Sequence, residues 1–320
     1  MNNSLAFNIW KKIFRIRYVE EKIASEYHKG EMRCPTHLSI GQEAVPSVLN
    51  LFLKKTDSAV SGHRAHAHYL AKGGNLKKML CEIFGKKNGC ANGRGGSMHL
   101  IDRNVGFAGS TAIVANSIPV GVGIALAKKL KKKKDLVIIY LGDGAIEEGA
   151  FYESINFAIL KKLPVFFVCE NNFYSVYTPM KFRQPKHRKI YKMIKGLGCN
   201  SFIVDGNNPF KIYKNISESI KYIKSGKGPV FGEFLTYRHR EHCGPNFDDH
   251  LNYRPKNEIK YWFKKDPLVF LENKLLSKKN LSKINHEKKK IISEVNEAFL
   301  FARKSKYPRQ KILKKDIYAK

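Results

Sequence analysis

The segment from residue 136 to residue 177 constrains the fold more than any other part of this chain. It begins with a continuous apolar run, Leu136 to Leu141, of the kind that forms a buried parallel strand. Gly142-Asp143-Gly144 interrupts the run, a helix is predicted from about residue 147 to 161, and a second apolar run extends from Val165 to Cys169. A strand, a crossover helix and a second strand make a βαβ unit, whose two strands are parallel. The sequence therefore predicts an α/β fold with a mainly parallel sheet.

Polar side chains follow both predicted strands. Asp143 comes directly after the first strand, and Glu170-Asn171-Asn172 ends the second. Because the carboxyl ends of parallel strands share one edge, we expect Asp143 and Asn172 to lie together where open α/β sheets bind ligands. A carboxylate and an amide oxygen suit Mg²⁺, which takes further ligands from water and phosphates. The flanking glycines let phosphates approach the backbone, and the following helix offers N–H groups to an anion. The pattern predicts a magnesium–diphosphate site; a strand-end turn capped by Asp and Asn is the alternative.

The spacing of this pattern resembles a known cofactor motif. Gly142-Asp143-Gly144, followed after 26 residues by Asn171-Asn172, is similar to the thiamine-diphosphate motif of thiamine-dependent enzymes. Over about residues 10 to 300, the chain resembles the alpha subunit of the decarboxylating component of 2-oxo acid dehydrogenase complexes, as in pyruvate and acetoin dehydrogenases. Further blocks occur in the order of that family, at residues 37–44, 63–66, 93–99, 113–114, 119–127 and 236–238. Several ordered blocks are more specific than one motif.

The resemblance implies a thiamine-diphosphate-binding fold, with helices on both faces of the sheet, and roles for individual residues. The Mg²⁺ ligands would be Asp143, Asn172 and the backbone carbonyl of Tyr174. The residues that contact thiamine diphosphate would be Arg64, Ile113, Val114, Asp143, Gly144, Ala145, Asn172 and Arg238. His66 and His242 would be the catalytic residues, with His242 on a mobile loop that closes over the cofactor and substrate.

The chain departs from the family pattern at three positions near these residues. His63 stands where the family often has Tyr, and the loop from residue 239 to 243 contains Glu241 and Cys243 where relatives commonly carry Gly and Ser. That serine is phosphorylated in some relatives, so we expect this regulation to be absent. Because the loop faces the substrate, the departures bear on substrate identity more than on cofactor identity.

Other polar residues of the matching blocks have less definite roles. His37 and His99 either line the pocket or satisfy turns, and His68 is expected to be structural. His239 is expected at the surface. The Gly-rich segment 85–109 is too long for an idle loop, and we expect it to lie over the cofactor site.

Length and composition favour one large domain over residues 1–320, with a basic helical C-terminal region from about residue 254 to 320. The chain has no run of 18 apolar residues and no signal-peptide pattern at its N-terminus, so no membrane association is expected. Six scattered cysteines without zinc spacing indicate reduced thiols and a cytoplasmic protein.

The net charge of +32 raises the possibility of nucleic-acid binding. The basic residues are mostly lysines, and no nucleic-acid motif accompanies them. We therefore expect no nucleic-acid partner; the charge would instead attract anionic 2-oxo acids and an acidic protein partner.

The resemblance implies oxidative decarboxylation of a 2-oxo acid, with pyruvate the first candidate, and transfer of the acyl group to a lipoyl group. The glutamate that such enzymes need at the aminopyrimidine would come from a separate beta subunit, giving an α2β2 heterotetramer that works with a lipoyl acyltransferase. The alternatives are an acetoin dehydrogenase-like enzyme, a thiamine-dependent enzyme of surface-sugar or secondary metabolism without a lipoyl complex, and a non-catalytic binding protein.

Overall fold

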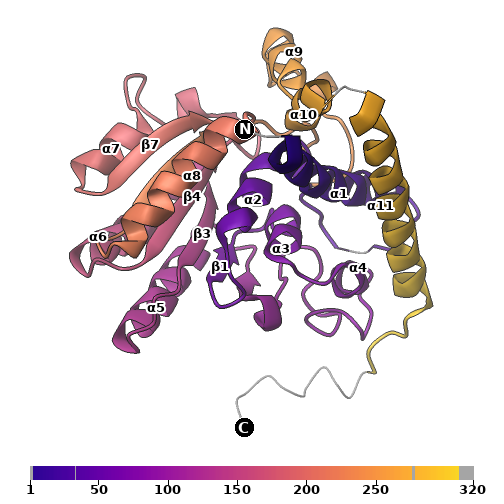
Figure 1. Cartoon of the computed structure of the whole chain (residues 1–320), viewed down its shortest axis with the longest axis horizontal. Helices are drawn as coiled ribbons and strands as arrows, with labels where there is room; N and C mark the ends of the chain where they lie inside the picture. Colours follow the sequence, from indigo (N-terminus) through magenta and orange to yellow (C-terminus); the bar gives the residue numbers. More distant parts are fainter. Residues whose placement is uncertain (1–2, 33, 276–277, 310–320) are drawn as a thin grey trace.

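A six-stranded, all-parallel sheet forms the centre of the computed structural model, which describes residues 3–32, 34–275 and 278–309 (Figure 1). The strand order is β2-β1-β3-β4-β8-β7. The strands are β1 (Ser58–Ser61), β2 (Phe107–Ser110), β3 (Val137–Gly142), β4 (Val165–Asn171), β7 (Asn200–Asp205) and β8 (Val230–Leu235), and a separate antiparallel pair consists of β5 (Tyr174–Ser175) and β6 (Thr178–Pro179). β3 and β4 are neighbours, so the predicted βαβ unit and α/β fold class are confirmed.

Alternate residues along the central strands face two different hydrophobic cores. In β3, Ile138 and Tyr140 belong to one core, whereas Val137, Ile139 and Leu141 belong to the other. Successive side chains of a strand point to opposite faces, and here both faces are covered. This double burial explains why the strand reads as a continuous apolar run rather than as an alternating pattern.

Helices cover both faces of the sheet, as predicted. On one face lie α5 (Ser117–Leu130), α6 (Gly149–Leu160) and α7 (Ile190–Gly196). The core on the other face includes residues of α2 (Ala44–Leu49), α3 (His66–Lys72) and α8 (Pro209–Lys224). The buried face of α8 contains isoleucines at positions 212, 216, 220 and 223, the spacing that places side chains on one side of a helix.

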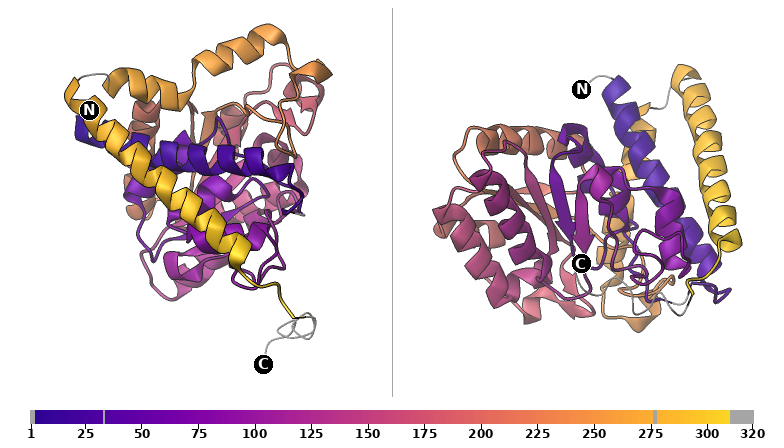
Figure 2. Two further views of the ribbon diagram at one scale, coloured as in Figure 1. Left: turned by 90° about the vertical axis from the view of Figure 1, so that its right-hand side faces the viewer. Right: turned by 90° about the horizontal axis from the view of Figure 1, so that it is seen from below.

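A further layer of helices joins the two ends of the described chain. It contains α1 (Asn3–Tyr27), α4 (Leu76–Ile83), α9 (Lys256–Lys264), α10 (Pro267–Leu275) and α11 (Lys278–Lys304). Figure 2 shows α11 crossing α1 on the outside of the molecule. Arg15 and Glu294 form an ion pair of 2.6 Å between these helices. Exposed pairs of this kind contribute little free energy, so the apolar side chains between the helices hold them together.

Short 3-10 turns connect several of these elements. They are η1 (Asn50–Phe52), η2 (Arg103–Val105), η3 (Asp143–Glu147), η4 (Met180–Phe182) and η5 (Asp249–Leu251). Because η3 occupies the residues after β3, helix α6 begins at Gly149, two residues later than predicted.

The predicted loop 85–109 contains an element that the sequence does not reveal. Its last residues form β2, an edge strand that pairs in parallel with β1 and buries Phe107 completely. The strand has four residues, two of them Ala and Gly, so it carries no readable apolar pattern.

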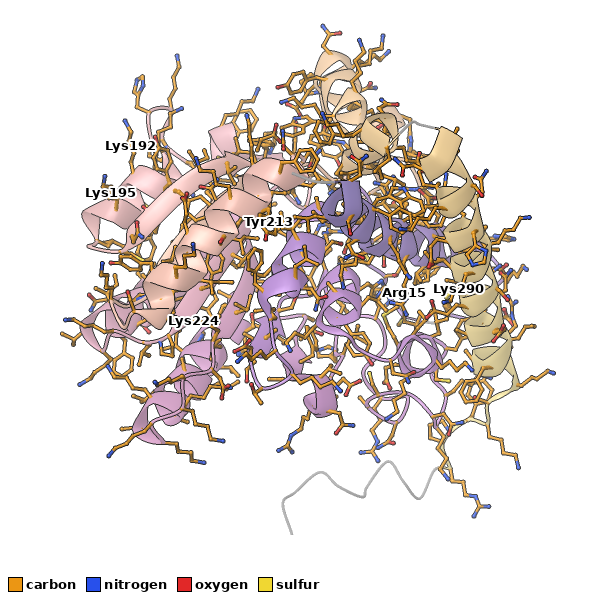
Figure 3. All side chains as sticks on the ribbon, viewed as in Figure 1. Arg15, Lys192, Lys195, Tyr213, Lys224 and Lys290 are labelled. Atoms are coloured by element: carbon orange, nitrogen blue, oxygen red, sulfur yellow. The ribbon has the colours of Figure 1, made fainter. Side chains whose placement is uncertain are left out.

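Exposed lysines occur on several helices of the described residues. Figure 3 labels Lys192 and Lys195 on α7, Lys224 on α8 and Lys290 on α11, and all four are exposed. These helices lie on separate parts of the molecule (Figure 1). Within the described residues, no helix combines the length and the apolar character needed to cross a membrane.

Two glycines of α5 differ sharply in their surroundings. A Cβ atom on Gly121 would lie 2.6 Å from Cγ1 of Ile139 and 2.9 Å from Cγ2 of Val60, inside a closed core. A Cβ atom on Gly123 would meet nothing within 4 Å. Only Gly121 is therefore required for the close approach of the helix to the sheet.

We predict opposite effects of the same substitution at these two positions. Gly121→Ala should lower the free energy of unfolding by about 1–3 kcal/mol through overpacking. Gly123→Ala should raise it by roughly 0.5–1 kcal/mol, because alanine loses less backbone entropy in a helix. Urea denaturation of both variants measures the difference, and a shift of the same sign in both would contradict the packing of α5 on β1 and β3.

Candidate functional site

The carboxyl ends of β3 and β4 bring Asp143 and Asn172 together. The strands are paired from Val137↔Val165 to Gly142↔Glu170, so both chains leave the sheet at one edge. Asp143 is 2% exposed and Asn172 is 9% exposed. The backbone of Asn172 lies near enough to the Asp143 carboxyl to help lower its pKa against the effect of burial. The predicted juxtaposition of these two side chains is therefore present.

A pocket opens at this edge of the sheet. Its volume is about 750 Å³ when the open mouth is included. Its walls come from the ends of β1, β3 and β4, from the start of α5 and from the loop after β8. Of the predicted site residues, it contains Arg64, Val114, Asp143, Gly144, Ala145, Asn172, Tyr174 and His242.

The turn after β3 has room for no side chain at Gly144. A Cβ atom on Gly144 would lie 2.8 Å from Oγ of Ser175, so a larger residue would displace the turn from the β5 strand. Gly142, Gly144 and Ala145 all line the pocket, and a bound phosphate could approach their backbone. The start of α6 at Gly149 does not line the pocket, so the expected contribution of this helix end is wrong.

Arg183 completes the surroundings of Asp143, and the sequence did not reveal it. Its guanidinium donates to Oδ2 of Asp143 and, over 2.6 Å, to Oε1 of Glu147. Burial raises the pKa of the Asp143 carboxyl, and the ion pair with Arg183 opposes that shift. The residue comes from the C-terminal end of η4, a segment without a recognisable motif.

Arg64 supplies a positive charge to the pocket. It donates to the backbone carbonyl oxygens of Leu38 over 2.6 Å and of His242 over 3.1 Å. Burial lowers its pKa to about 9, and Glu20 and Glu170 oppose this shift. The guanidinium therefore stays charged near neutral pH while it connects the two sides of the pocket mouth.

Arg238 lies outside the lining of the pocket. Its donors reach the carbonyl oxygens of Arg240 over 2.7 Å and Val176 over 3.1 Å, and the hydroxyl of Tyr253 over 2.9 Å. These bonds hold the loop after β8 in place. A contact between Arg238 and a phosphate would need some of them to be exchanged.

His66 is also outside the pocket. It is completely buried, with Nδ1 2.6 Å from Oε1 of Glu20 and Nε2 2.8 Å from Oγ of Ser97. Both ring nitrogens thus have partners, and no nitrogen faces the ligand space. The geometry gives no support to the predicted catalytic role and indicates that His66 positions α1 and the 93–99 segment relative to the pocket.

His242 reaches the pocket mouth together with two other histidines. The ring centroids of His37, His63 and His242 lie 4.5 to 5.3 Å apart. Burial, followed by the charge of Arg64, lowers the pKa of His37 to about 2, of His63 to about 4 and of His242 to about 3. The three imidazoles are therefore neutral at physiological pH.

His68 lies on the floor of the pocket, where it belongs to a buried polar group. Its ring stacks on Tyr140 at 3.8 Å, and its nitrogens bond Oγ of Ser61 over 2.7 Å and Oε2 of Glu170 over 2.9 Å. The other oxygen of Glu170, Oε1, is buried without a protein partner. Glu170 is thus a polar pocket residue that the sequence analysis did not assign.

The loop after β8 is anchored along the 36–40 segment. His239 N donates to Ile40 O over 3.0 Å, and Gly244 N donates to Thr36 O over 2.8 Å. His239 is buried, with its ring stacked on Phe263 at 4.2 Å, so its expected surface position is wrong. Cys243 is exposed on this loop.

The apolar residues at the pocket mouth are partly uncovered. Val114 lines the pocket but is 47% exposed, and the neighbouring Ile113 is 65% exposed. In the described part of the chain, no residue from 85–109 lines this pocket, so its expected place over the site is wrong. His99 instead lines a separate hollow with Cys34 and the 93–98 segment.

Comparison with known proteins agrees with this geometry and confirms the predicted family. The family model described as "Dehydrogenase E1 component" matches residues 11–311. The pyruvate dehydrogenase E1 component subunit alpha of Rickettsia bellii is 35% identical over 314 residues, covering 97% of this chain and 94% of that protein. The alpha subunit of the acetoin:2,6-dichlorophenolindophenol oxidoreductase of Bacillus subtilis is 33% identical over 311 residues, covering 97% and 92%. The chain belongs to the dehydrogenase E1 component family.

Proposed function

We propose that this chain is the alpha subunit of a thiamine-diphosphate-dependent 2-oxo acid dehydrogenase and that its substrate is pyruvate. The observation that carries the proposal is the pocket at the ends of β3 and β4, which joins Asp143, Asn172 and a tight glycine turn. Relatives from several organisms that align over nearly the whole chain are named pyruvate dehydrogenase E1 alpha subunits. The site and the names point to the same chemistry.

The residues present fit thiamine diphosphate with Mg²⁺. Asp143 and Asn172 offer side-chain oxygens and Tyr174 a backbone oxygen, the hard donors that Mg²⁺ prefers. Arg183 is paired with Oδ2 of Asp143, so a Mg²⁺ ion would have to share this carboxylate with the guanidinium or displace it. Gly144 and Ala145 would hold the diphosphate at the turn, and Arg64 would face it from the other wall.

Thiamine diphosphate, when bound, supplies the carbon nucleophile and the electron sink that decarboxylation of a 2-oxo acid requires. The chain itself provides a positive potential from Arg64, which attracts an anionic substrate to the mouth of the pocket. His63 and His242 are neutral there, so each can donate one hydrogen bond to the carboxylate or carbonyl of the substrate and keep its second ring nitrogen as an acceptor. We keep His242 as a catalytic candidate and assign His66 a positioning role.

A beta subunit would complete the site. Ile113 and Val114 leave an apolar part of the pocket mouth open, and α5 and α6 carry further exposed apolar side chains, with Val120 at 51%, Phe157 at 37% and Leu160 at 71% exposure. Exposed apolar side chains beside an open pocket mouth support an interface with a second protein. We propose an α2β2 heterotetramer with the cofactor at the interface, a cytoplasmic location, and acyl transfer to a lipoyl acyltransferase.

An acetoin dehydrogenase-like activity is the second candidate. The Bacillus subtilis relative is nearly as similar to this chain as the rickettsial proteins are. The altered loop with Glu241 and Cys243 lies next to His242, at the position where a different substrate would be distinguished.

The first prediction concerns the cofactor site. Asp143→Ala should weaken Mg²⁺-dependent binding of thiamine diphosphate by roughly tenfold or more, about 1.4 kcal/mol, because the carboxylate ligand is lost. Asp135→Ala, at the opposite end of the same strand region, is the matched control and should bind like the wild type. Calorimetric titration with Mg²⁺ and with a chelator measures both; equal binding by the two variants would refute the site.

The second prediction concerns activity and substrate. The chain purified with its beta subunit should reduce 2,6-dichlorophenolindophenol in the presence of pyruvate, and the chain alone should not, because the pocket is open without its partner. Faster reduction with acetoin than with pyruvate would favour the second candidate. Activity of the single chain equal to that of the complex would contradict the proposed interface site.

The third prediction concerns the apolar face. Phe157→Glu should weaken association with the beta subunit by tenfold or more, roughly 1.4 kcal/mol, because a carboxylate would be buried without a partner. Leu300→Glu, at an exposed leucine on α11, should assemble normally. Size-exclusion chromatography of the co-expressed proteins gives the result, and loss of assembly in the Leu300 variant alone would place the interface on the other side of the molecule.

A further inference from the structure

Three histidines from distant parts of the sequence meet at the mouth of the pocket. His37 follows the segment after α1, His63 follows β1, and His242 lies on the loop after β8. One ring nitrogen from each can be chosen so that all three atoms lie within 4.8 Å of one another. The imidazoles thus form a triangle that joins the 36–40 segment, the end of β1 and the anchored loop.

The ring nitrogens of this triangle are incompletely used by the protein. His37 is 6% exposed, and its Nδ1 is buried without a hydrogen-bond partner. A buried polar atom without a protein partner costs free energy, and this nitrogen is free to bond to a ligand. His242 has one weak contact, 3.4 Å between Nδ1 and Nη2 of Arg64. This unpartnered nitrogen is an observation separate from the clustering, and it belongs to one of the three rings.

The chemistry of three converging imidazoles is specific. Neutral imidazole nitrogens bind borderline transition metals such as Zn²⁺, whereas Mg²⁺ prefers oxygen ligands. Three histidines with an open fourth position are a known ligand set for Zn²⁺. The low pKa values of these rings keep their lone pairs available at neutral pH. A transition metal would therefore distinguish this triangle from the oxygen ligands at Asp143.

We propose that His37, His63 and His242 form a binding site for one divalent transition-metal ion, Zn²⁺ in the first place, separate from the Mg²⁺ site. Zinc–nitrogen bonds are about 2.0–2.1 Å long, so the rings must close slightly around the ion. The remaining coordination position faces the pocket, where water or a substrate oxygen would occupy it.

The charges around the triangle set the strength of binding. Arg64 lies beside His242 and repels a cation, whereas Glu20 and Glu170 offset that charge. Binding is therefore weaker than at a structural zinc site, and the ion is exchangeable. Bound metal ties the 239–246 loop to the 36–40 segment across the mouth of the pocket. If the proposed function holds, Zn²⁺ is a reversible inhibitor that a chelator relieves.

Direct metal binding tests the site without any enzyme assay. Titration of the full chain with Co²⁺, followed by visible absorption, should show one equivalent with the intense bands of a low-coordinate ion, and Zn²⁺ should displace it. His63→Phe and His242→Gln should each weaken this binding at least tenfold. His187→Gln, at an exposed histidine away from the pocket, should leave it unchanged. Asp143→Ala should also leave it unchanged, which separates the triangle from the Mg²⁺ site.

Several results would overturn the proposal. Unaltered Co²⁺ binding in both histidine variants excludes the triangle, and loss of binding in Asp143→Ala assigns the ion to the other site. Thermal unfolding shows whether each variant is folded. Should either histidine variant be unfolded, anomalous diffraction from zinc-soaked wild-type crystals decides, because density away from the three rings refutes the site. These readouts do not depend on thiamine diphosphate, so they stand apart from failure of the proposed function.

Discussion

The parallel pairing of β3 with β4 is the constraint on which the rest of the site depends. Both strands are buried on both faces, so their register is fixed by two cores at once. A slip of one residue would turn each side chain to the opposite face. With the register fixed, Asp143 and Asn172 must leave the sheet at the same edge. The pocket therefore follows from the packing of the sheet before any polar contact is made.

Ion pairs then stabilise the buried carboxylates that the fold positions. The carboxylate of Asp143 is buried and needs a positive partner, which Arg183 provides here. Arg17 forms ion pairs with Glu43 and Asp266 in the same way, and Arg254 forms one with Asp248. A guanidinium can satisfy two carboxylate oxygens and is less strongly hydrated than an ammonium group, so it suits buried pairs. The lysines, by contrast, stay largely at the surface.

The sequence predicted those features that depend on local pattern. The run from residue 136 to 141, the break at Asp143 and the second run from residue 165 are enough for the βαβ unit, and the ordered blocks identify the family. The sequence did not show that Arg183 contacts Asp143 or that both ring nitrogens of His66 have hydrogen-bond partners. These contacts join residues 31 to 46 positions apart in the chain. The predicted position of the 85–109 segment was wrong, because the four-residue edge strand β2 is too short to show a periodic apolar pattern. Tertiary contacts, not propensity, decide such positions.

The histidine triangle shows how one departure from a family pattern can change the chemistry of a site. His37 and His242 lie in matching blocks, but the third ring is present because residue 63 is His where the family often has Tyr. A tyrosine at this position would offer a phenol in place of an imidazole nitrogen, and two imidazoles alone would hold a metal ion more weakly. One nitrogen of the neighbouring His37, Nδ1, is buried without a protein partner. His63 and His242 also line the pocket that binds the cofactor in our proposal, so a metal ion bound at the triangle would also change access to the reaction.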